Sequence, residues 1–523
     1  MPSEPTETEL PPVRAAASSD AGHLAAIDLG SNSFRLELAT YQGGRYRRID
    51  YLKETVRLGG GLDENSRLVG PAVDRGLACL ARFRTRLADL PARCIRAVAT
   101  QTLREAANRD EFLQAASQAL GQPIEVISGR EEARLTFNGV AALQPADARR
   151  LVIDIGGRST EMILGQGRHI RCAESYGVGS VSLSRRFFGD GQYSAAAFAA
   201  AQVAAAAEFE EARELFTPDR WDQALGSSGT AGAVSKVLAA HGRTDGSITA
   251  DGLRWCMQAC VQAGSVDKLA LRSLEPGRLP IIGGGIAILA ALLDLFGITS
   301  LRPAKGALRQ GVIVDLVERL QAEVKADHHD LRDDSVRTLQ ARFGVDRAQA
   351  RRVHLNAVAL YAGLARPASL EHVRELGWVA DLHEIGMAVS HHDHHRHSAY
   401  LLAHVDAPGF SQSQQRMLAK LVLGQRGGLR KVQDLWSDTQ RLQQLLALRL
   451  AVLLCHPRIE APSGLQVQLT PRPDGHVLAL HWPASWSGDL PRMTYLLEQE
   501  AAAWAKMDGL QVICGKLALS PAS

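Results

Sequence analysis

The stretch LAAIDLGSNSFRLELATYQGG (24–44) decides the fold, because the chain repeats its pattern at RRLVIDIGGRSTEMILGQG (149–167). Each copy starts with an apolar run, passes through Asp, Gly and small polar residues, and continues into a second run closed by glycine. This order is typical of a buried strand, a tight loop and a second strand. Aligning Asp28 with Asp154 gives D-[LI]-G-x-x-S in both copies, 126 residues apart. Two similar half-domains, each with its own loop, are therefore predicted.

Further strands and helices surround these two copies. The pattern predicts a third strand from residue 45, a helix over residues 71–87, and another strand that runs into a helix over residues 94–106. LPIIGGGIAIL (279–289) is predicted to be a third junction between a buried strand and a glycine turn. The half-domain pair is expected to close over residues 307–320, so the fold class is α/β.

Beyond residue 320 the pattern changes. Residues 330–455 predict successive amphipathic helices, and residues 464–483 predict a β-hairpin followed by a helix and a strand. We therefore expect a disordered tail (1–20), half-domain I (21–142), half-domain II (143–320), a helical domain (321–458) and a small α+β domain (459–523).

Composition narrows the class of protein. The chain has 523 residues, of which 46% are hydrophobic and 22% charged, which excludes a disordered or disulfide-stapled protein. Seven cysteines without a CxxC pair favour a reducing, cytoplasmic compartment. The first twenty residues lack the basic start and apolar run of a signal peptide, and the apolar run 281–298 is too interrupted to span a bilayer comfortably. A net charge of only +3 means that any anion site must be local.

The two Asp-loops carry the first chemical signal. A strand that ends in Asp-x-Gly exposes backbone N–H groups that can bind phosphate oxygens. The aspartates would instead hold a divalent cation, through water, that bridges to those phosphates. A single Asp-x-Gly would be simply a turn. Two copies on matching β-structures resemble the actin-like superfamily of sugar kinases, actins and chaperone ATPases, in which two phosphate loops face across a cleft.

Glu131 and Glu132 open a predicted helix in ISGREEARLTFNGV (127–140). Carboxylates at this position are favoured by the helix dipole, so capping is the simple interpretation. A glutamate that projects into a phosphate cleft would instead be a candidate general base, and neighbouring carboxylates would raise its pKa.

Longer motifs then identify a specific family. AIDLGSNSFRL, ATQTLREA, SGREEARLTF, VIDIGGRSTEM, GSSGTAGAV and KGALRQGV occur in the order seen in the exopolyphosphatase/guanosine pentaphosphatase family, and the helical region is similar to that of its long bacterial members. The resemblance implies two actin-like (ribonuclease H-like) half-domains, a mostly helical HD-like domain and a small α+β domain.

The resemblance also implies roles for individual residues. Glu132 matches the catalytic base, and Arg104 matches an arginine that grips substrate phosphate. Asp28, Asp154 and Glu161 match acidic residues around a metal. The remaining matches lie in phosphate-binding loops: Ser31, Asn32, Ser33, Gly156, Gly157, Ser159, Thr160, Ser228, Gly229 and Thr230.

Arg158 departs from the family pattern, since the second loop normally reads DIGGGST and here reads DIGGRST. If the replaced glycine uses a positive φ, arginine there costs about 1 kcal/mol or more. We expect the Arg158 guanidinium to grip phosphate. The alternative is that it obstructs the loop and weakens activity.

Seven of the seventeen histidines lie between residues 383 and 404. His383-Glu384 with HHDHHRH suggests a transition-metal site. The HD phosphohydrolases, which the helical region resembles, use a His-Asp pair and a distant aspartate, whereas the corresponding position near Val452 carries no acid. A structural role, or a basic wall along an anion channel, is therefore favoured.

The leading functional hypothesis is an exopolyphosphatase that releases terminal orthophosphate from inorganic polyphosphate by metal-assisted attack of water. The alternative is a guanosine pentaphosphate 5′-phosphohydrolase. An actin-like kinase or ATPase is less favoured, because a glutamate lies at the phosphate cleft and no sugar-specificity insert is evident. A non-catalytic sensor is less favoured because the acidic set is intact, and Arg158 keeps it open. Mg²⁺ is the expected cofactor, with K⁺ as a candidate activator. The expected assembly is a homodimer without nucleic acid, and peripheral membrane association stays open.

Overall fold

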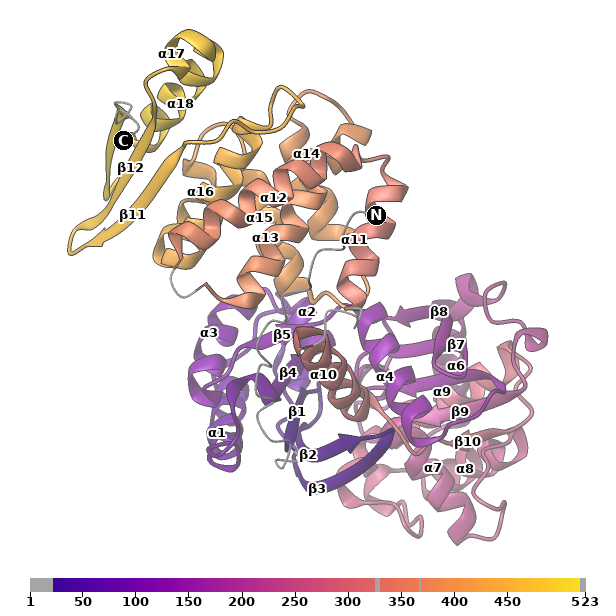
Figure 1. Cartoon of the computed structure of the whole chain (residues 1–523). Coiled ribbons are helices and arrows are strands. Elements are labelled where there is room, and N and C mark those ends of the chain that lie inside the picture. The colour runs from indigo at the N-terminus through magenta and orange to yellow at the C-terminus, as the bar shows by residue number, and fades with distance from the viewer. Residues whose placement is uncertain (1–21, 325–329, 366–367, 518–523) are drawn as a thin grey trace. The chain divides into compact units, whose positions relative to one another are not determined.

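The computed structural model describes residues 22–324, 330–365 and 368–517, so the predicted tail lies outside the described residues. Two compact units make up the chain (Figure 1). The first runs to Ile124 and resumes over Glu132–Leu320, and the second contains Glu125–Glu131 and the chain from Gln321 onwards.

Two five-stranded sheets form the framework of the first unit, and they have the same topology. One has the order β3-β2-β1-β4-β5 and the other the order β8-β7-β6-β9-β10. In both sheets the first strand pairs antiparallel with the second and parallel with the fourth. The predicted repeat of two actin-like half-domains is therefore confirmed. The strands are β1 (Leu24–Leu29), β2 (Phe34–Gln42), β3 (Arg45–Glu54), β4 (Ile95–Ala99), β5 (Ile124–Val126), β6 (Arg149–Ile155), β7 (Thr160–Gln166), β8 (His169–Tyr176), β9 (Gln223–Ser227) and β10 (Leu301–Pro303).

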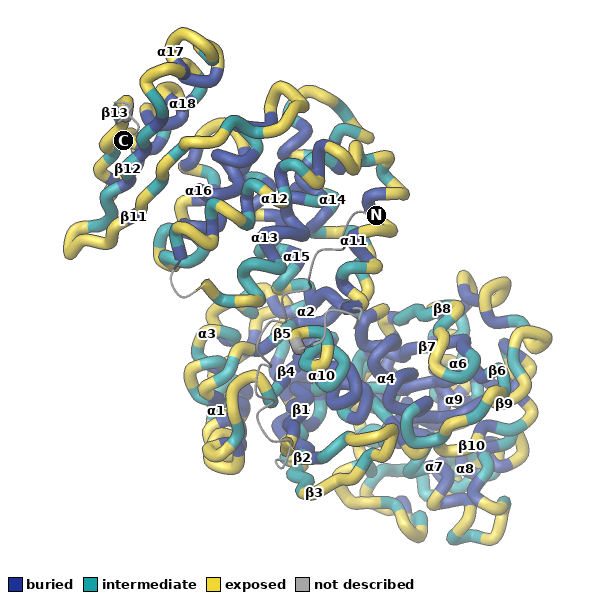
Figure 2. Tube along the Cα trace, viewed as in Figure 1, coloured by how far each residue is buried: buried dark blue, intermediate teal, exposed yellow. Residues whose placement is uncertain are grey.

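The repeat extends to fine details of strand pairing. The register between β2 and β3 shifts at Leu38/Ala39, and that between β7 and β8 shifts at Leu164/Gly165, again 126 residues later. All six residues of β1 are buried, because this strand is central and covered on both faces (Figure 2). Each central strand therefore delivers its terminal aspartate to the same place in its half-domain.

Helices α1–α4 belong to the chain segment of the first sheet, and α5–α10 follow in the segment of the second. Their bounds are α1 (Gly70–Arg86), α2 (Gln101–Glu105), α3 (Arg109–Leu120), α4 (Gly129–Leu143), α5 (Ser180–Phe187), α6 (Ala195–Phe209), α7 (Ser228–Ala240), α8 (Ala250–Ala263), α9 (Ile282–Leu295) and α10 (Leu308–Val324).

Helices α4 and α10 approach each other closely through glycines. A Cβ at Gly139 of α4 would lie 2.2 Å from the Ala307 carbonyl oxygen, and one at Gly311 of α10 would lie 1.7 Å from the Leu135 carbonyl oxygen. Since α4 leads from the first sheet to the second, this crossing ties together the two half-domains.

The predicted strand and glycine turn at residues 279–289 are wrong. A 3₁₀ segment, Pro276–Ile281, leads directly into α9, and the three glycines form its first turn. A Cβ at Gly284 would lie 2.6 Å from the backbone nitrogen of Ser184, so these glycines permit close helix packing rather than a turn. By length and composition Pro276–Leu295 could cross a membrane, but most of it is buried, as in the core helix of a soluble protein.

The second unit is helical with a small sheet, and the predicted hairpin and final helix and strand are confirmed. Its helices are α11 (Leu331–Arg342), α12 (Arg347–Leu364), α13 (Leu370–Leu382), α14 (His394–His404), α15 (Gln412–Gly424), α16 (Thr439–Leu454), α17 (Trp486–Asp489) and α18 (Pro491–Trp504). Its strands are β11 (Gln466–Arg472), β12 (Gly475–Pro483) and β13 (Leu510–Leu517). Trp482 and Trp504 share one hydrophobic core with Leu445 of α16, so sheet and helices bury a common surface.

Candidate active site

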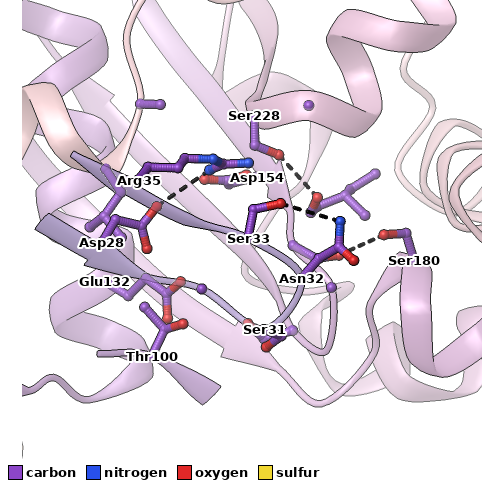
Figure 3. A pocket seen from close by; sticks show the side chains of 18 of the residues that line it. Asp28, Ser31, Asn32, Ser33, Arg35, Thr100, Glu132, Asp154, Ser180 and Ser228 are labelled. Carbon is purple, nitrogen blue, oxygen red and sulfur yellow. Dashed lines mark hydrogen bonds and ion pairs between the residues drawn. The ribbon is translucent and has the colours of Figure 1, made fainter. Parts of the chain in front are cut away.

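A polar cavity of about 80 Å³ lies where the loops of both half-domains meet (Figure 3). Twelve of the residues singled out from the sequence line it: Asp28, Ser31, Asn32, Ser33, Glu132, Asp154, Gly156, Gly157, Ser159, Glu161, Ser228 and Gly229. The structure thus brings both Asp-loops and the small-residue turn into one site.

The two Asp-loops have equivalent local geometry. A Cβ at Gly30 would lie 3.1 Å from the Ser33 carbonyl oxygen, and one at Gly156 would lie 3.1 Å from that of Ser159. In the second loop the Gly156 N–H also donates to the Ser159 carbonyl over 2.9 Å. These tight turns bring the small and polar residues of both loops to the wall of the cavity, as a phosphate-binding loop requires.

The third loop begins α7, directly after β9. Ser228 has a φ of 62°, which is rare for a residue other than glycine, and its Oγ donates to the Ile155 carbonyl over 3.0 Å. Thr230 donates to the same carbonyl and does not line the cavity. Gly229 leaves room for a guanidinium, because a Cβ there would lie 1.4 Å from Nη2 of Arg278.

Four buried carboxylates line the cavity: Asp28, Glu132, Asp154 and Glu161. Burial, together with Asp154 and Asp28, raises the pKa of Glu132 to about 7, although Arg104 lowers it. Burial is also the main cause that raises the pKa of Asp154 and of Glu161. Such a cluster favours a bound cation and makes Glu132 a base suited to neutral pH.

Three arginines also line the cavity, and the sequence interpretation missed them. Arg35 lies 3.3 Å from Asp28, and Arg309 lies 3.7 Å from the same carboxylate (Figure 3 shows Arg35 and Asp28). Arg278 completes the group. Arg35 is the cross-strand partner of Asp28, just as Glu161 is the cross-strand partner of Asp154. Because the aligned repeat matches Arg35 with Glu161, it could have revealed Arg35 as a site residue.

Arg309 lies in the quoted motif KGALRQGV, which was a usable signal. Nothing in the sequence pattern indicated Arg278. Thr100 and Ser180 also line the cavity and were not predicted.

The carboxylates fit a magnesium ion held largely by water and phosphate. Among the described residues, no group of three or more His, Cys, Asp or Glu side chains could hold a metal by itself. Oδ1 of Asp154 is buried and accepts no hydrogen bond from the described residues, so a coordination position is open there. Mg²⁺ commonly binds through one or two carboxylates together with waters and substrate phosphates, which agrees with this donor set.

Two predicted phosphate ligands, Arg104 and Arg158, do not line the cavity. Arg104 donates to Glu132 Oε2 over 2.9 Å, so it contacts the candidate base. Arg158 has an ordinary negative φ, and its guanidinium pairs with Glu105. The backbone strain considered for this position is absent, and the guanidinium forms an ion pair rather than lining the cavity. Thr160 likewise donates to the Val178 carbonyl, which is a structural role.

The histidine-rich segment belongs to the second unit. Its neighbour His354 lies 3.0 Å from Asp381, and Glu384 pairs with Arg458 over 3.1 Å. Burial lowers the pKa of both His394 and His395 to about 4, so these two imidazoles are neutral at physiological pH. They therefore add no positive charge to a basic wall.

Comparison with known proteins identifies the family. The model of the Ppx/GppA phosphatase family matches residues 40–320. The model of Ppx/GppA phosphatase, domain III, matches residues 331–501. The chain belongs to the Ppx/GppA phosphatase family. It is accordingly a hydrolase of phosphoanhydride bonds, as the sequence predicted.

Curated relatives cover nearly the whole chain. A guanosine-5′-triphosphate,3′-diphosphate pyrophosphatase of Aeromonas hydrophila is 36% identical over 88% of this chain and 92% of its own length. One of Vibrio vulnificus with the same name is 36% identical over 91% of this chain and 95% of its own length.

Solved structures agree in fold. A crystal structure of an exopolyphosphatase-like protein matches with a TM-score of 0.52 and 25% identity, covering 57% of this chain and 99% of that one. An exopolyphosphatase from Cytophaga hutchinsonii matches with a TM-score of 0.51 and 22% identity, covering 57% and 98%, and this likeness shows the fold alone.

Proposed function

We propose that this chain removes the terminal phosphate from the 5′-triphosphate of guanosine 5′-triphosphate 3′-diphosphate. The observation that carries this choice is the 36% identity, over about nine-tenths of the chain, to relatives named for that substrate. It is the alternative that the sequence left open beside polyphosphate hydrolysis.

A second cavity supports a substrate with two phosphate arms. It has a volume of about 310 Å³ and shares Arg35, Arg278 and Arg309 with the first cavity. Further basic residues line it alone: Arg48, Lys53, Lys236 and Lys305.

Glu275 lines this cavity and lies 3.5 Å from Lys53 and 4.0 Å from Lys236. Asp28 and Glu37 pair with Arg35 and Arg309, so seven basic side chains have three carboxylates as partners. The second cavity therefore keeps a strong excess of positive charge. A 5′-triphosphate in the first cavity would leave a 3′-diphosphate on the same ribose to be neutralised in the second.

The proposed mechanism assigns the base and its neighbours. Glu132 accepts a proton from the attacking water, and its raised pKa makes it an effective acceptor near neutral pH. Arg104 holds the carboxylate of Glu132 in place through its 2.9 Å hydrogen bond. The loop amides and hydroxyls around Ser31 and Ser159 bind the terminal phosphates.

Charge on the transferred phosphoryl group is neutralised from two sides. Arg35, Arg278 and Arg309 line the cavity and face the phosphates. When bound at Asp154 and Glu161, Mg²⁺ supplies charge neutralisation and polarises phosphorus. Arg35 comes from the first half-domain, whereas Arg278 and Arg309 come from the second, as Asp154 and Glu161 do.

Inorganic polyphosphate is the second candidate substrate, because the joined basic cavities could also hold a linear polyanion. We also propose, from the family resemblance, a cytoplasmic homodimer. Light scattering would test the assembly, and fractionation of cells would test both location and any peripheral membrane association.

The test of the substrate is phosphate release from guanosine 5′-triphosphate 3′-diphosphate, GTP and long-chain polyphosphate, compared at equal ionic strength. We expect the highest kcat/KM with the doubly phosphorylated nucleotide. A Lys236→Ala/Lys305→Ala variant should raise KM for that nucleotide severalfold and leave the KM for GTP unchanged. Lys268→Ala, an exposed lysine outside both cavities, is the matched control. Equal kcat/KM for GTP and the pentaphosphate would refute the proposal, and a higher value for polyphosphate would favour the second candidate.

A further inference from the structure

Arg158 connects the two half-domains beside the active site. It lies in the loop between β6 and β7, whereas its partner Glu105 ends α2 of the first half-domain. Its Nε and Nη2 donate to Glu105 Oε2 over 2.9 and 2.5 Å. The Arg158 and Glu105 side chains are 23% and 29% exposed, so the pair is partly shielded from solvent.

The Arg158 side chain is also held by packing. Its Nη1 donates to the Gly59 carbonyl over 3.4 Å, and a Cβ at Gly59 would lie 3.0 Å from Cδ of Arg158. Gly59 in turn donates its N–H to the Ser31 carbonyl of the first phosphate loop over 2.8 Å. The arginine therefore rests against the first half-domain with both its stem and its guanidinium.

A chain of hydrogen bonds runs from this ion pair to the candidate base. The Gln101 side-chain amide donates to Glu105 Oε1 over 2.5 Å, and its oxygen accepts from Arg104 Nε over 2.8 Å. Arg104 Nη1 then donates to Glu132 Oε2 over 2.9 Å.

The donor and acceptor groups of these side chains fix the direction of each hydrogen bond in the series. A carboxylate only accepts, so Glu105 obliges Gln101 to turn its NH₂ group towards it and its oxygen towards Arg104. The two oxygens of Glu105 have different partners, one in Gln101 and one in Arg158. Releasing Glu105 from Arg158 would free Glu105 to rotate and would weaken one of the two contacts, to Glu105 and to Arg104, that hold the Gln101 side chain in place.

We propose that Arg158 is a positioning residue for the catalytic base, acting through Glu105, Gln101 and Arg104 on Glu132. The inference rests on the assignment of Glu132 in the proposed function, and it concerns the step of water activation rather than substrate binding. This role also explains why an arginine is present at position 158 of the phosphate loop although its side chain does not line the cavity.

The competing account, in which Arg158 binds phosphate directly, predicts the opposite behaviour of Glu105. Under positioning, removing the charge of either partner disrupts the same chain, so Glu105→Gln resembles Arg158→Gln. Under direct binding, loss of Arg158 weakens phosphate binding, whereas loss of the anionic Glu105 relieves repulsion and strengthens it.

The test is a double-mutant cycle with Arg158→Gln, Glu105→Gln and the double variant, using both the pentaphosphate and polyphosphate as substrates. We expect each single variant to lower kcat roughly ten-fold with little change in KM, because small misplacements of reacting groups are costly. The double variant should be no slower than either single variant. Arg158→Lys, which keeps the charge, should recover part of the rate.

Two results would overturn the proposal: a raised KM for Arg158→Gln with a lowered KM for Glu105→Gln, or multiplicative losses in the double variant. Thermal unfolding of each variant shows whether it is folded. If Arg158→Gln is unfolded, the kcat and KM of the conservative Arg158→Lys variant are compared with those of the wild type instead. If the wild type hydrolyses polyphosphate but not the pentaphosphate, the proposed substrate fails, and the same cycle read with polyphosphate still decides the role of Arg158.

Discussion

Replacing Glu132 by Gln should strongly lower activity and at the same time stabilise the protein. The pKa of Glu132 rises from 4.5 to about 7 on folding, chiefly because the carboxylate is buried. Each pH unit between the two pKa values corresponds to about 1.4 kcal/mol, so the ionised group destabilises the fold by about 3 kcal/mol above pH 7. Glutamine keeps the shape without the charge.

The pH dependence gives the sign of this effect. Below the pKa of 4.5 that Glu132 has when unfolded, the group is protonated in both states and the substitution should change little. Between that pH and about 7 the unfolded state releases its proton first, so the advantage of glutamine grows with pH and then levels off. We therefore expect Glu132→Gln to gain up to about 3 kcal/mol in free energy of unfolding at pH 8.

Urea unfolding of the wild type and Glu132→Gln from pH 4 to pH 8, at constant ionic strength, measures this difference. Glu64→Gln, at an exposed carboxylate, is the matched control and should give a flat difference near zero. Phosphate release by Glu132→Gln should fall by roughly 10²–10⁴-fold, the usual contribution of a general base. A difference that does not grow with pH would refute the burial argument, and near-normal turnover would show that another carboxylate is the base.

Three other predictions follow from the site and the helix crossing. Asp154→Asn should lower turnover and raise the Mg²⁺ concentration needed for half-maximal rate; a Mg²⁺ titration that overlays the wild type would remove Asp154 from the metal site. Arg104→Gln removes the cation that lowers the pKa of Glu132, so the acidic limb of kcat/KM should move to higher pH, and an unmoved limb would contradict the pairing. Gly139→Ala should destabilise the protein by about 1–3 kcal/mol or more in thermal unfolding, because its Cβ would lie 2.2 Å from a backbone oxygen. Gly232→Ala, a helical glycine with nothing within 4 Å of a Cβ, should be tolerated; equal stability of the two variants would refute the packing argument.

The parts of the site that were predictable are those fixed by local backbone pattern. Asp28 and Asp154 follow apolar runs and precede glycine, so their place at the ends of central strands could be inferred from spacing alone. Glu132 was singled out by its place at a helix start and then by family resemblance. Arg278 could not be found this way, because it reaches the cavity by tertiary packing against Gly229.

One wrong prediction and one contact that the sequence did not reveal have the same physical origin. Three consecutive glycines at 283–285 suggest a turn locally, yet here they allow α9 to pack closely against Ser184 and its neighbours. Arg158 lies in a phosphate-loop sequence, and its pairing with Glu105 depends on a side chain 53 residues away. Neither packing nor long-range pairing is encoded in the spacing of residues along one segment.

The matched pairs Asp28–Arg35 and Asp154–Glu161 also bear on how such a protein could evolve. If the two half-domains arose by duplication of one ancestral gene, a symmetric pair of identical copies would carry either two arginines or two glutamates at this position. Once the gene was duplicated, the two positions could mutate independently. Duplication thus permitted a division of labour at this one position, where the first copy carries a cation and the second an anion.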